Sequence, residues 1–382
     1  MNRRLFLVSG GLAGLSVVAG LGAFAATRRP AAALLPWEQA GLSRNDPRRY
    51  VVEHAILAPN PHNRQPWIVE LIGEDRMRLF CDLDRRLPHT DPFDRQIVIG
   101  LGCFTELASL AASALGYRLD VVPFPEGEPQ PRLDQRPVAD FRMVREAGLR
   151  VDPLFAHVKA RRSTKRPYDL DRAVPAAALA ELARLSTGDV AVVGLGDAVQ
   201  VERLRALTWE AWGIESATAR THKESVDLMR IGRSEIEANP DGISLGGLFL
   251  EGLALTGQLT RAQMIDPTSS AFRQGQDMYR AMLAATPAYL IVVANDGGRA
   301  GELAAGRAYL RANLAATGLG LSMQPVSQAL QEFPEMAGAK AKVEEAVAIA
   351  SPKRLHMLAR LGYGPAVDET PRWAAATRIR QA

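Results

Sequence analysis

The chain has few cysteines and no metal-binding pattern. Its 382 residues include only Cys81 and Cys103, which do not form a C-x-x-C pair; this excludes a disulfide framework and a zinc ribbon. The six histidines include no pair four residues apart, and no Walker loop or catalytic-triad signature is present. Each cysteine lies in an apolar run, so we predict two buried thiols and no metal site.

The chain also lacks a strong charge of one sign. Lys and Arg number 46 against 42 Asp and Glu, which gives a net charge of +4, and part of that excess lies at the extreme N-terminus. A balance this close to neutral argues against nucleic-acid binding. Hydrophobic residues at 47% and charged residues at 23% are typical of a folded protein with a sizeable core.

The first residues are typical of an export signal. Arg3-Arg4 precedes an apolar run, residues 7–26, that is rich in Gly and Ala and contains Ala23-Phe24-Ala25 near its end. This order predicts a twin-arginine signal over residues 1–26, handled by the export machinery for folded proteins, and a location in the periplasm or cell envelope. The alternative is a membrane anchor, because about 20 apolar residues can span a bilayer.

Helical and strand patterns alternate along the remaining chain, which predicts the α+β class. The expected helices are 48–57, 93–115, 153–160, 175–185, 301–317 and 335–350, and the expected strands are 67–72, 77–83, 117–123, 138–144 (at a sheet edge), 189–193, 288–294 and 355–363. We expect two halves, residues 45–150 and 151–372, with a helical insertion at about 204–285 in the second. Residues 365–382 are expected to be extended, with 373–382 as a terminal tail.

Three short segments carry chemistry. They read APNPHNRQPW (58–67), RRSTKRP (161–167) and GLGLSMQPVS (318–327), and a single Pro-flanked base, Arg372, follows near the end. The guanidinium, ammonium and hydroxyl groups of the second segment suit a phosphate. The amides and backbone groups of the other two suit a flat heterocycle with donors and acceptors on its edge.

Together the segments resemble the FMN-dependent nitroreductase family, specifically its exported, double-length branch. The first is similar to that family's Pro-Ser-x-x-Asn-x-Gln-Pro-Trp loop, the second to its Arg-Arg-Ser-x-Arg/Lys segment, and the third to its Gly-Leu-Gly helix end and flavin-facing strand. RLGYGPAVDETPR (360–372) is similar to its Gly-Tyr-Pro element and late Arg. The resemblance covers most of residues 46–372 apart from the insertion. It implies two similar halves, each with a mixed, mostly antiparallel sheet flanked by helices, and FMN as the cofactor.

The order of the segments differs from that of ordinary family members. There the Arg-Arg-Ser segment precedes the Asn-x-Gln-Pro-Trp loop, two short chains pair, and each FMN lies between subunits. Here the loop near residue 60 comes first and the Arg-Arg-Ser segment follows near residue 161. We infer a fused pseudo-dimer that is a monomer, keeps one complete site and binds one FMN per chain.

The resemblance also implies roles for individual residues. The ribityl-phosphate contacts are expected from Arg161, Ser163, Lys165 and Arg372. The isoalloxazine is expected to be lined by Pro59, Asn60, Pro61 and Asn63, with a backbone N–H of Val326-Ser327 facing flavin N5. Gln65 and Trp67 are expected to hold the loop, and His62 to point outward. The family's Asn and Lys at the pyrimidine edge have no match, so Gln274, Gln276 or Arg280 is expected to substitute. No side chain is assigned a catalytic role.

Each feature also has a purely structural interpretation. The bases of 161–166 and Arg372 could be solvated, Asn63 and Gln65 could be turn formers, and Gly318 and Gly320 could simply end a helix.

For function, the first hypothesis is a nitroreductase-type enzyme that uses FMN to transfer two electrons from a small-molecule donor to an electron-poor acceptor such as a nitro compound or a quinone. The alternatives are an FMN-sequestering protein whose insertion forms a lid, and a membrane-tethered structural protein.

Overall fold

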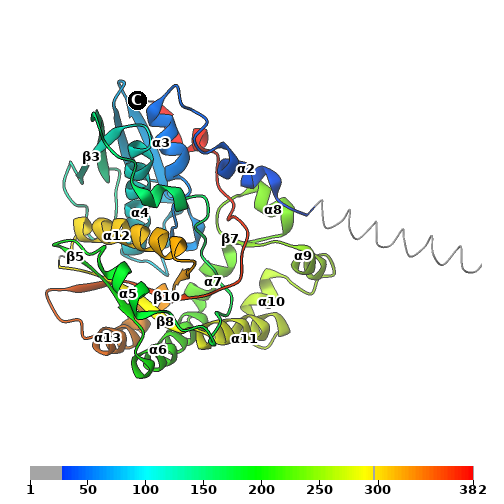
Figure 1. Ribbon diagram of the computed structural model, residues 1–382. Helices are drawn as coiled ribbons and strands as arrows, with labels where there is room; N and C mark the ends of the chain where they lie inside the picture. Colours follow the sequence, from blue (N-terminus) through cyan, green and yellow to red (C-terminus); the bar gives the residue numbers. More distant parts are fainter. Residues whose placement is uncertain (1–27, 296, 382) are drawn as a thin grey trace, which may run out of the picture.

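The computed structural model describes residues 28–295 and 297–381, and within them the chain forms two main β-sheets with helices packed between and around them (Figure 1). The predicted export signal lies outside the described residues. Helix α12 crosses the middle of the molecule, with the first sheet on one side and the second sheet on the other (Figure 1). The structure is therefore of the α+β class, as predicted.

The first sheet has the strand order β11-β1-β2-β4-β3. Its strands are β1 (Trp67–Ile72), β2 (Arg76–Cys81), β3 (Tyr117–Pro123), β4 (Ala139–Arg145) and β11 (Ile379–Gln381). The predicted hairpin is confirmed as the antiparallel pair β1 and β2. The prediction that the strand near 138–144 lies at an edge is wrong, because β4 pairs on both sides, with β2 and with β3.

The second sheet has the strand order β5-β8-β10-β9, and all its neighbours are antiparallel. Its strands are β5 (Val190–Leu195), β8 (Ala288–Ala294), β9 (Ser322–Pro325) and β10 (Arg354–Gly362). Every residue of β8 is buried, which agrees with its uninterrupted apolar sequence. If the four strands of this sheet are numbered in the order of the sequence, they lie side by side in the order first, second, fourth, third. Strands β1 to β4 of the first sheet lie in the same order.

Two long helices, α4 (Arg95–Ser113) and α12 (Arg299–Gly318), pack directly on each other. Gly102 and Gly306 permit this contact: a Cβ added to Gly306 would lie 2.1 Å from the carbonyl oxygen of Ile99, and one added to Gly102 would lie 2.2 Å from that of Leu303. Cys103 lies in the same contact, and both cysteines are buried free thiols, as predicted. Among the described residues, α4 is the one helix long and apolar enough to span a bilayer, and most of it is buried in the core.

The remaining helices surround this core. They are α2 (Ala31–Gln39), α3 (Pro47–Ala55), α5 (Ala176–Ala183) and α13 (Ala337–Ala346), with short 3-10 turns η1 (Pro61–Asn63), η2 (Leu83–Arg85), η3 (Pro153–His157), η4 (Ser327–Leu330), η5 (Pro334–Met336) and η6 (Ala375–Arg378). The side chain of Asp46 accepts hydrogen bonds from the backbone N–H groups of Arg48 and Arg49 and thereby caps α3. The helix predicted at 153–160 is only a 3-10 turn.

The segment between β5 and β8 is largely helical, as predicted. It contains α6 (Ala198–Ala217), α7 (Ala219–Asp227), α8 (Gly232–Ala238), α9 (Leu248–Leu255), α10 (Arg261–Ile265) and α11 (Ser270–Ala284). It also contains a two-stranded parallel sheet of β6 (Met229–Ile231) and β7 (Ile243–Leu245), which the sequence does not indicate because each strand has only three residues. We call residues 196–287 the insertion.

The C-terminal segment connects the two sheets. After β10 it runs extended from the second sheet back to the first (Figure 1), and β11 pairs in parallel with β1 through Val69 and Ile379. The expectation of a simple extended tail is therefore incomplete. Strand β11 was missed because its three residues are too few to show a pattern and its pairing partner is about 310 positions earlier in the sequence.

Candidate functional site

The loop between α3 and β1 has an unusual backbone. His62, Asn63 and Gln65 have φ values of +47°, +51° and +52°, in the left-handed region that residues other than glycine seldom occupy. Three such residues within four positions must be held by their surroundings, and conformations of this kind concentrate at functional sites. We call residues 57–66 the site loop.

Gln65 fixes the site loop to two distant parts of the chain. Its side chain is fully buried; the amide donates to the carbonyl of Pro240 in the insertion at 2.6 Å, and its oxygen accepts from the N–H of Trp373 at 2.9 Å. Trp67 is also fully buried, and its ring lies 5.2 Å from that of Phe104. Both residues therefore have the holding roles that were predicted.

The two asparagines of the site loop are engaged within the protein. Asn60 Oδ1 accepts from the N–H of Gln65 at 2.7 Å, and Asn60 Nδ2 donates to the carbonyl of Ala58 at 3.1 Å. Asn63 Nδ2 donates to the carbonyl of Pro371 at 3.1 Å, and Asn63 Oδ1 accepts from Arg372 Nη1. Asn63 is thus more than a turn former, because it positions Arg372.

The prolines of the site loop pack against the core. Pro59 is buried, and Pro61 and Asn60 lie so close to Gly100 of α4 that a Cβ added there would come within 3.1 Å of each. The first turns of α4 therefore set the position of the site loop.

Arg161 and Arg372, more than 200 positions apart in sequence, meet at the site loop. Arg161 Nη2 and Arg372 Nη2 both donate to the carbonyl of Leu57, each at 3.2 Å, and Arg372 Nη2 also donates to Ala58 O at 3.2 Å. Both side chains are buried, with exposures of 4% and 3%. The interpretation of these two bases as solvated surface groups is therefore excluded.

These two guanidinium groups carry uncompensated charge. Burial lowers the pKa of Arg161 to about 10 and that of Arg372 to about 9, with no carboxylate among the causes. The charge of Arg162 lowers both pKa values further, while Tyr309 and Cys103 oppose the change at Arg161. Arg161 Nη1 and Arg372 Nε are buried without a hydrogen-bond partner in the described chain. Because a buried cation is costly unless it is paired, this arrangement is suited to an anion.

Arg162, next to Arg161, has a different environment. Its Nη2 donates to Glu369 Oε1 at 2.8 Å, and its guanidinium lies 4.7 Å from the ring centroid of Trp37 in α2. Trp37 also lies beneath Arg372, at 5.6 Å. Sequence reasoning missed Trp37, since a lone Trp in an apolar stretch is typical of a core residue.

Ser163 lies beside the other predicted segment. It forms an isolated parallel bridge with Met323 of β9, and β9 leads directly to Val326 and Ser327. The Val326 N–H donates to the carbonyl of Leu358 at 2.9 Å, so this N–H is already occupied. The predicted backbone contact to a flavin therefore remains available only from Ser327.

Lys165 and His62 form a second polar group. Lys165 is exposed; desolvation by the protein around it lowers its pKa, and the charge of Glu215 opposes that change. His62 is half-buried, its Nδ1 has no partner in the described chain, and its pKa is lowered to about 3 by burial and by the charges of Lys165 and Arg64. The expectation that His62 points outward is wrong for its Nδ1, which is buried in the protein.

The insertion supplies a carboxyl group to this second polar group. Glu215 of α6 is buried, accepts hydrogen bonds from Ser225 Oγ at 3.2 Å and Gln331 Nε2 at 3.0 Å, and interacts electrostatically with Lys165. Burial raises its pKa to about 7. Sequence reasoning missed Glu215, since one Glu in a long helix carries no motif.

The residues expected at the pyrimidine edge are not brought to the site loop by any described contact. Gln276 Oε1 accepts from Trp212 Nε1 at 2.7 Å. Arg280 lies 4.7 Å from the ring of Trp209 and lines an open cavity of about 350 Å³ on the outside of the insertion. Gln274 is exposed.

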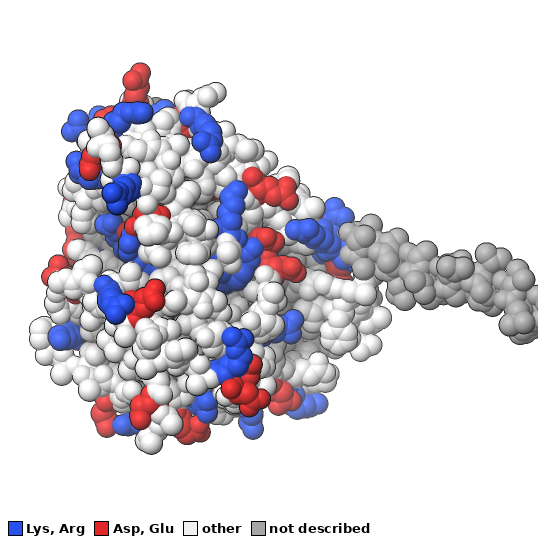
Figure 2. All heavy atoms as spheres, in the orientation of Figure 1, with Lys and Arg blue, Asp and Glu red and all other residues white. Residues whose placement is uncertain are grey.

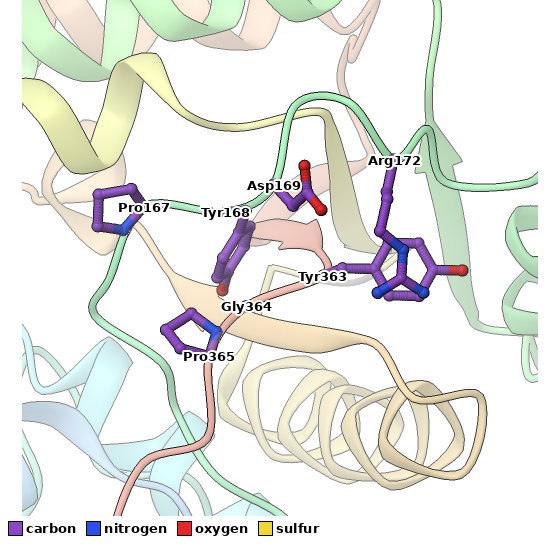
Figure 3. Close-up of a pocket in the computed structure, with 7 residues that line it drawn as sticks. All are labelled: Pro167, Tyr168, Asp169, Arg172, Tyr363, Gly364 and Pro365. Atoms are coloured by element: carbon purple, nitrogen blue, oxygen red, sulfur yellow. The ribbon is translucent and has the colours of Figure 1, made fainter.

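Another open cavity, of about 400 Å³, lies just after the basic segment (Figure 3). Its lining comprises Pro167, Tyr168, Asp169, Arg172, Tyr363, Gly364 and Pro365. Arg172 lies over the ring of Tyr363, 3.7 Å from its centroid (Figure 3). No predicted site residue lines this cavity. Within residues 28–295 and 297–381, no group of three His, Cys, Asp or Glu residues is arranged to hold a metal ion.

Comparison with known proteins gives short and distant similarities. No protein-family model matches the chain. The Mycobacterium tuberculosis protein named "Putative NAD(P)H nitroreductase acg" is 39% identical over 75 residues, which is 19% of this chain and 22% of that protein. A second M. tuberculosis protein with the same type of name is 32% identical over 78 residues, or 20% and 22% of the two chains. The chain thus matches about a fifth of the length of these curated relatives.

Solved structures give fold matches at low sequence identity. A nitroreductase with bound FMN from Bacteroides fragilis aligns with 58% of this chain and 96% of its own, with a TM-score of 0.35 and 15% identity. The FMN-dependent nitroreductase NfnB from Mycobacterium smegmatis, in complex with NADPH, aligns with 59% of this chain and 90% of its own, with a TM-score of 0.32 and 18% identity.

Proposed function

We propose that the protein is an FMN-binding oxidoreductase of the nitroreductase type. The observation that carries the proposal is the pair Arg161 and Arg372, two buried guanidinium groups that converge on one carbonyl, have no carboxylate partner and each keep a nitrogen without a partner. The short similarity to mycobacterial proteins named as nitroreductases supports the same direction.

The residues present fit the phosphate end of FMN. A phosphate supplies the missing negative charge and accepts from the free nitrogens of Arg161 and Arg372. Ser163, two residues after Arg161 and next to β9, offers a hydroxyl donor to the same group or to the ribityl chain. Lys165 interacts instead with His62 and Glu215, so we assign it to the ring system and not to the phosphate.

The ring system would then lie between the site loop and the residues that follow β9. Pro59, Pro61 and the left-handed backbone of the site loop would form one wall, with Asn60 and Asn63 holding its shape. The Ser327 N–H would face flavin N5. Bound FMN supplies two-electron chemistry through N5; the chain's own residues bind it, orient it and set the charge around it. A small-molecule donor and an electron-poor acceptor, such as a nitro compound or a quinone, would use this site in turn.

We further propose one FMN per chain in a fused pseudo-dimer. The two sheets share the strand order first-second-fourth-third, and the helices α4 and α12 meet between them as two subunits would. The site loop comes from the first half, whereas Arg161, Ser163 and the residues after β9 come from the second. The proposal therefore assigns one complete set of contacts to each chain, and the chain is expected to act as a monomer. Export by the twin-arginine pathway to the periplasm is part of the same proposal.

The second candidate is a protein that sequesters FMN without turnover. The insertion contacts the site loop directly: Gln65 donates to the Pro240 carbonyl, and Arg64 pairs with Asp241 at 2.7 Å. An insertion fixed in this way would restrict access to a flavin beneath it. This supports the hypothesis that the insertion forms a lid over a sequestered FMN.

An absorbance spectrum with a protein-to-FMN ratio tests the proposal. We expect one FMN per chain. Arg161→Gln and Arg372→Gln each remove a charge-assisted hydrogen bond of about 1.5–3 kcal/mol, so each should weaken FMN binding about 10- to 150-fold. The double variant should be colourless.

Arg166→Gln provides the matched control, because Arg166 lies in the same basic segment but is exposed; it should retain FMN. Full FMN occupancy in the Arg161 and Arg372 double variant would contradict the site. Bleaching by NADPH, with reoxidation by a nitroaromatic compound or quinone, supports the enzyme. A yellow protein that no donor reduces supports sequestration.

A further inference from the structure

Three consecutive residues of the insertion each contact one residue of the site loop. The pairs run in reverse order along the two segments: Pro240 with Gln65, Asp241 with Arg64, and Gly242 with Asn63. The donor–acceptor distances are 2.6, 2.7 and 3.2 Å, respectively. The insertion is therefore bonded along the stretch of the site loop that has the left-handed backbone. We call residues 240–242 the clamp.

Asp241 is the charged centre of the clamp. Its Oδ2 accepts from Nη1 of Arg64 and from Nη1 of Arg85 in η2, both at 2.7 Å, and its Oδ1 accepts from Arg230 Nη2 at 3.3 Å. The acidic and basic side chains visible in Figure 2 lie at the surface, where water screens an ion pair. Asp241 is only 6% exposed, so its charge binds the three guanidinium groups more strongly. Removing that charge leaves three largely buried cations close together, which is unfavourable.

Gly242 places the clamp against the site loop. Its φ is +80°, and a Cβ added to it would lie 2.2 Å from the carbonyl oxygen of Leu228, so only glycine fits at this position. The next residue, Ile243, donates its N–H to the same carbonyl at 2.9 Å and pairs with Met229 in the β6–β7 sheet. The small sheet of the insertion therefore fixes the clamp in place.

The site loop in turn holds the guanidinium group of Arg372. Asn63 Oδ1 accepts from Arg372 Nη1, and the carbonyl of Leu57 accepts from Arg372 Nη2. We propose that Asp241 is a positioning residue for the anion site formed by Arg161 and Arg372, because the clamp keeps the site loop in the conformation that places Arg372. This inference rests on the proposed function, in which Arg161 and Arg372 bind the phosphate of FMN.

The clamp also limits how the insertion can move. Because residues 240–242 bond the same segment that positions Arg372, lifting them from the site loop would displace Arg372. A separate contact joins the insertion to the first half: Glu224 of α7 accepts from the N–H groups of His89 and Thr90 at 3.0 and 2.9 Å. At the clamp, therefore, the insertion acts as part of the anion site and not as a cover that opens.

The test compares two substitutions in the full chain. Asp241→Asn removes the charge of the clamp with little change in size. Glu224→Gln is the matched control, because it weakens the separate contact, whose hydrogen bonds do not involve the site loop. Hydrogen exchange followed by mass spectrometry measures the clamp before FMN is added. We expect Asp241→Asn to speed exchange in residues 57–66 severalfold and Glu224→Gln to leave it unchanged.

The affinity for FMN then tests whether the clamp acts through Arg372. Asp241→Asn should weaken FMN binding about tenfold in the unsubstituted chain, but by no more than about twofold in the Arg372→Gln background. Glu224→Gln should keep the affinity of the unsubstituted chain. A merely structural role of Asp241 would lower the affinity by the same factor in both backgrounds, and that result would overturn the proposal.

The other outcomes also decide the question. Unchanged exchange in residues 57–66 of Asp241→Asn, or faster exchange with unchanged FMN affinity, contradicts the proposal. If Asp241→Asn does not fold, Arg64→Gln carries the same test, since Asp241 then keeps Arg85 and Arg230 as partners. If the unsubstituted chain binds no FMN, the proposed function fails, and inorganic phosphate replaces FMN as the probe because it needs only the two guanidinium groups. No phosphate binding, or an equal loss in both backgrounds, then contradicts the positioning role as well.

Discussion

The two sheets share a strand order but differ at one connection. In the first sheet, β1 and β2 are joined by the three-residue turn Gly73-Glu74-Asp75, whereas in the second, β5 and β8 are joined by the whole insertion, residues 196–287. Surface connections tolerate long insertions because loop-closure entropy rises slowly with length. The first sheet shows that this strand arrangement does not need an insertion. The insertion adds contacts with the site loop and the carboxyl group of Glu215.

The two halves also contribute different chemistry to the candidate site. The first provides a frame of carbonyl groups and amide side chains, chiefly Leu57 and Asn63, and the second provides the guanidinium of Arg161. Arg372 belongs to the C-terminal segment that crosses from the second sheet to the first. Neither half alone holds both the carbonyl and amide frame and the guanidinium groups of the candidate anion site. Substitutions where the two halves meet or differ therefore test this comparison.

The largest effect is expected where the two halves touch. Gly306→Val would place a branched side chain where even a Cβ lies 2.1 Å from the Ile99 carbonyl oxygen. Because both α12 and α4 are rigid at this point, the helices must separate, and we expect a loss of about 4 kcal/mol or more in the free energy of unfolding. Thermal unfolding followed by circular dichroism measures it.

Gly338→Ala in α13 is the control, because nothing lies within 4 Å of the added Cβ. It should stay within about 1 kcal/mol of the unsubstituted protein, in the stabilising direction, since alanine favours a helix over glycine. If Gly306→Val were equally well tolerated, the close packing of the two halves would be wrong.

A smaller effect is expected from Glu215, in the insertion that only the second sheet has. Its pKa in the folded protein is raised from 4.5 to about 7, chiefly by burial and also by Glu224, while Lys165 opposes the rise. The folded state therefore binds the proton more tightly than the unfolded state. This contribution is complete below about pH 4.5, falls as the pH rises to about 7, and is then lost, a change of order 3 kcal/mol.

Glu215→Gln keeps hydrogen-bonding groups at this position and cannot ionise. The variant should gain stability relative to the unsubstituted protein as the pH rises from 5 to 8, measured as the difference between their urea unfolding midpoints at each pH. Asp91 and Glu302 also have raised pKa values, of about 6 and about 7, but they are common to both proteins and cancel in the difference. Parallel pH profiles would contradict the assignment.

The smallest effect is expected from making the first sheet more like the second. Deleting residues 379–382 removes β11 and leaves four strands, the number in the second sheet. Loss of this short parallel pairing with β1 should cost about 1–2 kcal/mol, measured by urea unfolding. Arg380→Ala, which removes the ion pair with Glu70 and the cation–π contact with the ring of Phe80 but keeps the backbone pairing of β11, should change stability by less than about 1 kcal/mol. Equal effects would mean that β11 contributes only the contacts of the Arg380 side chain.

Local patterns predicted the regular elements well where the pattern was long. Strand β8, with seven consecutive apolar residues, helix α4 and the β1–β2 hairpin all follow from periodicity and turn residues. Strands β6, β7 and β11 were not predicted, because a strand of three residues is too short to show a periodic pattern. The edge position of β4 was wrong since strand order depends on contacts between distant segments.

The same contrast holds for the candidate site. The residue types in the site loop and the basic segment indicated an anion and a flat ring, and their structure keeps Ser163 beside β9 and Arg161 beside the site loop. Sequence could not separate Arg161 from Arg162, because only burial and the position of Glu369 show that one is paired and the other is not. The burial of His62 Nδ1 likewise depends on groups that only the folded chain brings together.

The sequence by itself therefore determined the class of fold, the main helices and strands, and the kinds of side chain available for a phosphate and a ring. Only the tertiary structure decided which cations are left without a carboxylate partner, and that Arg372 and Asn63 meet across about 310 positions. The reason is physical: hydrophobic period and turn chemistry act over a few neighbouring residues, whereas burial and charge pairing depend on groups that only the folded chain brings together.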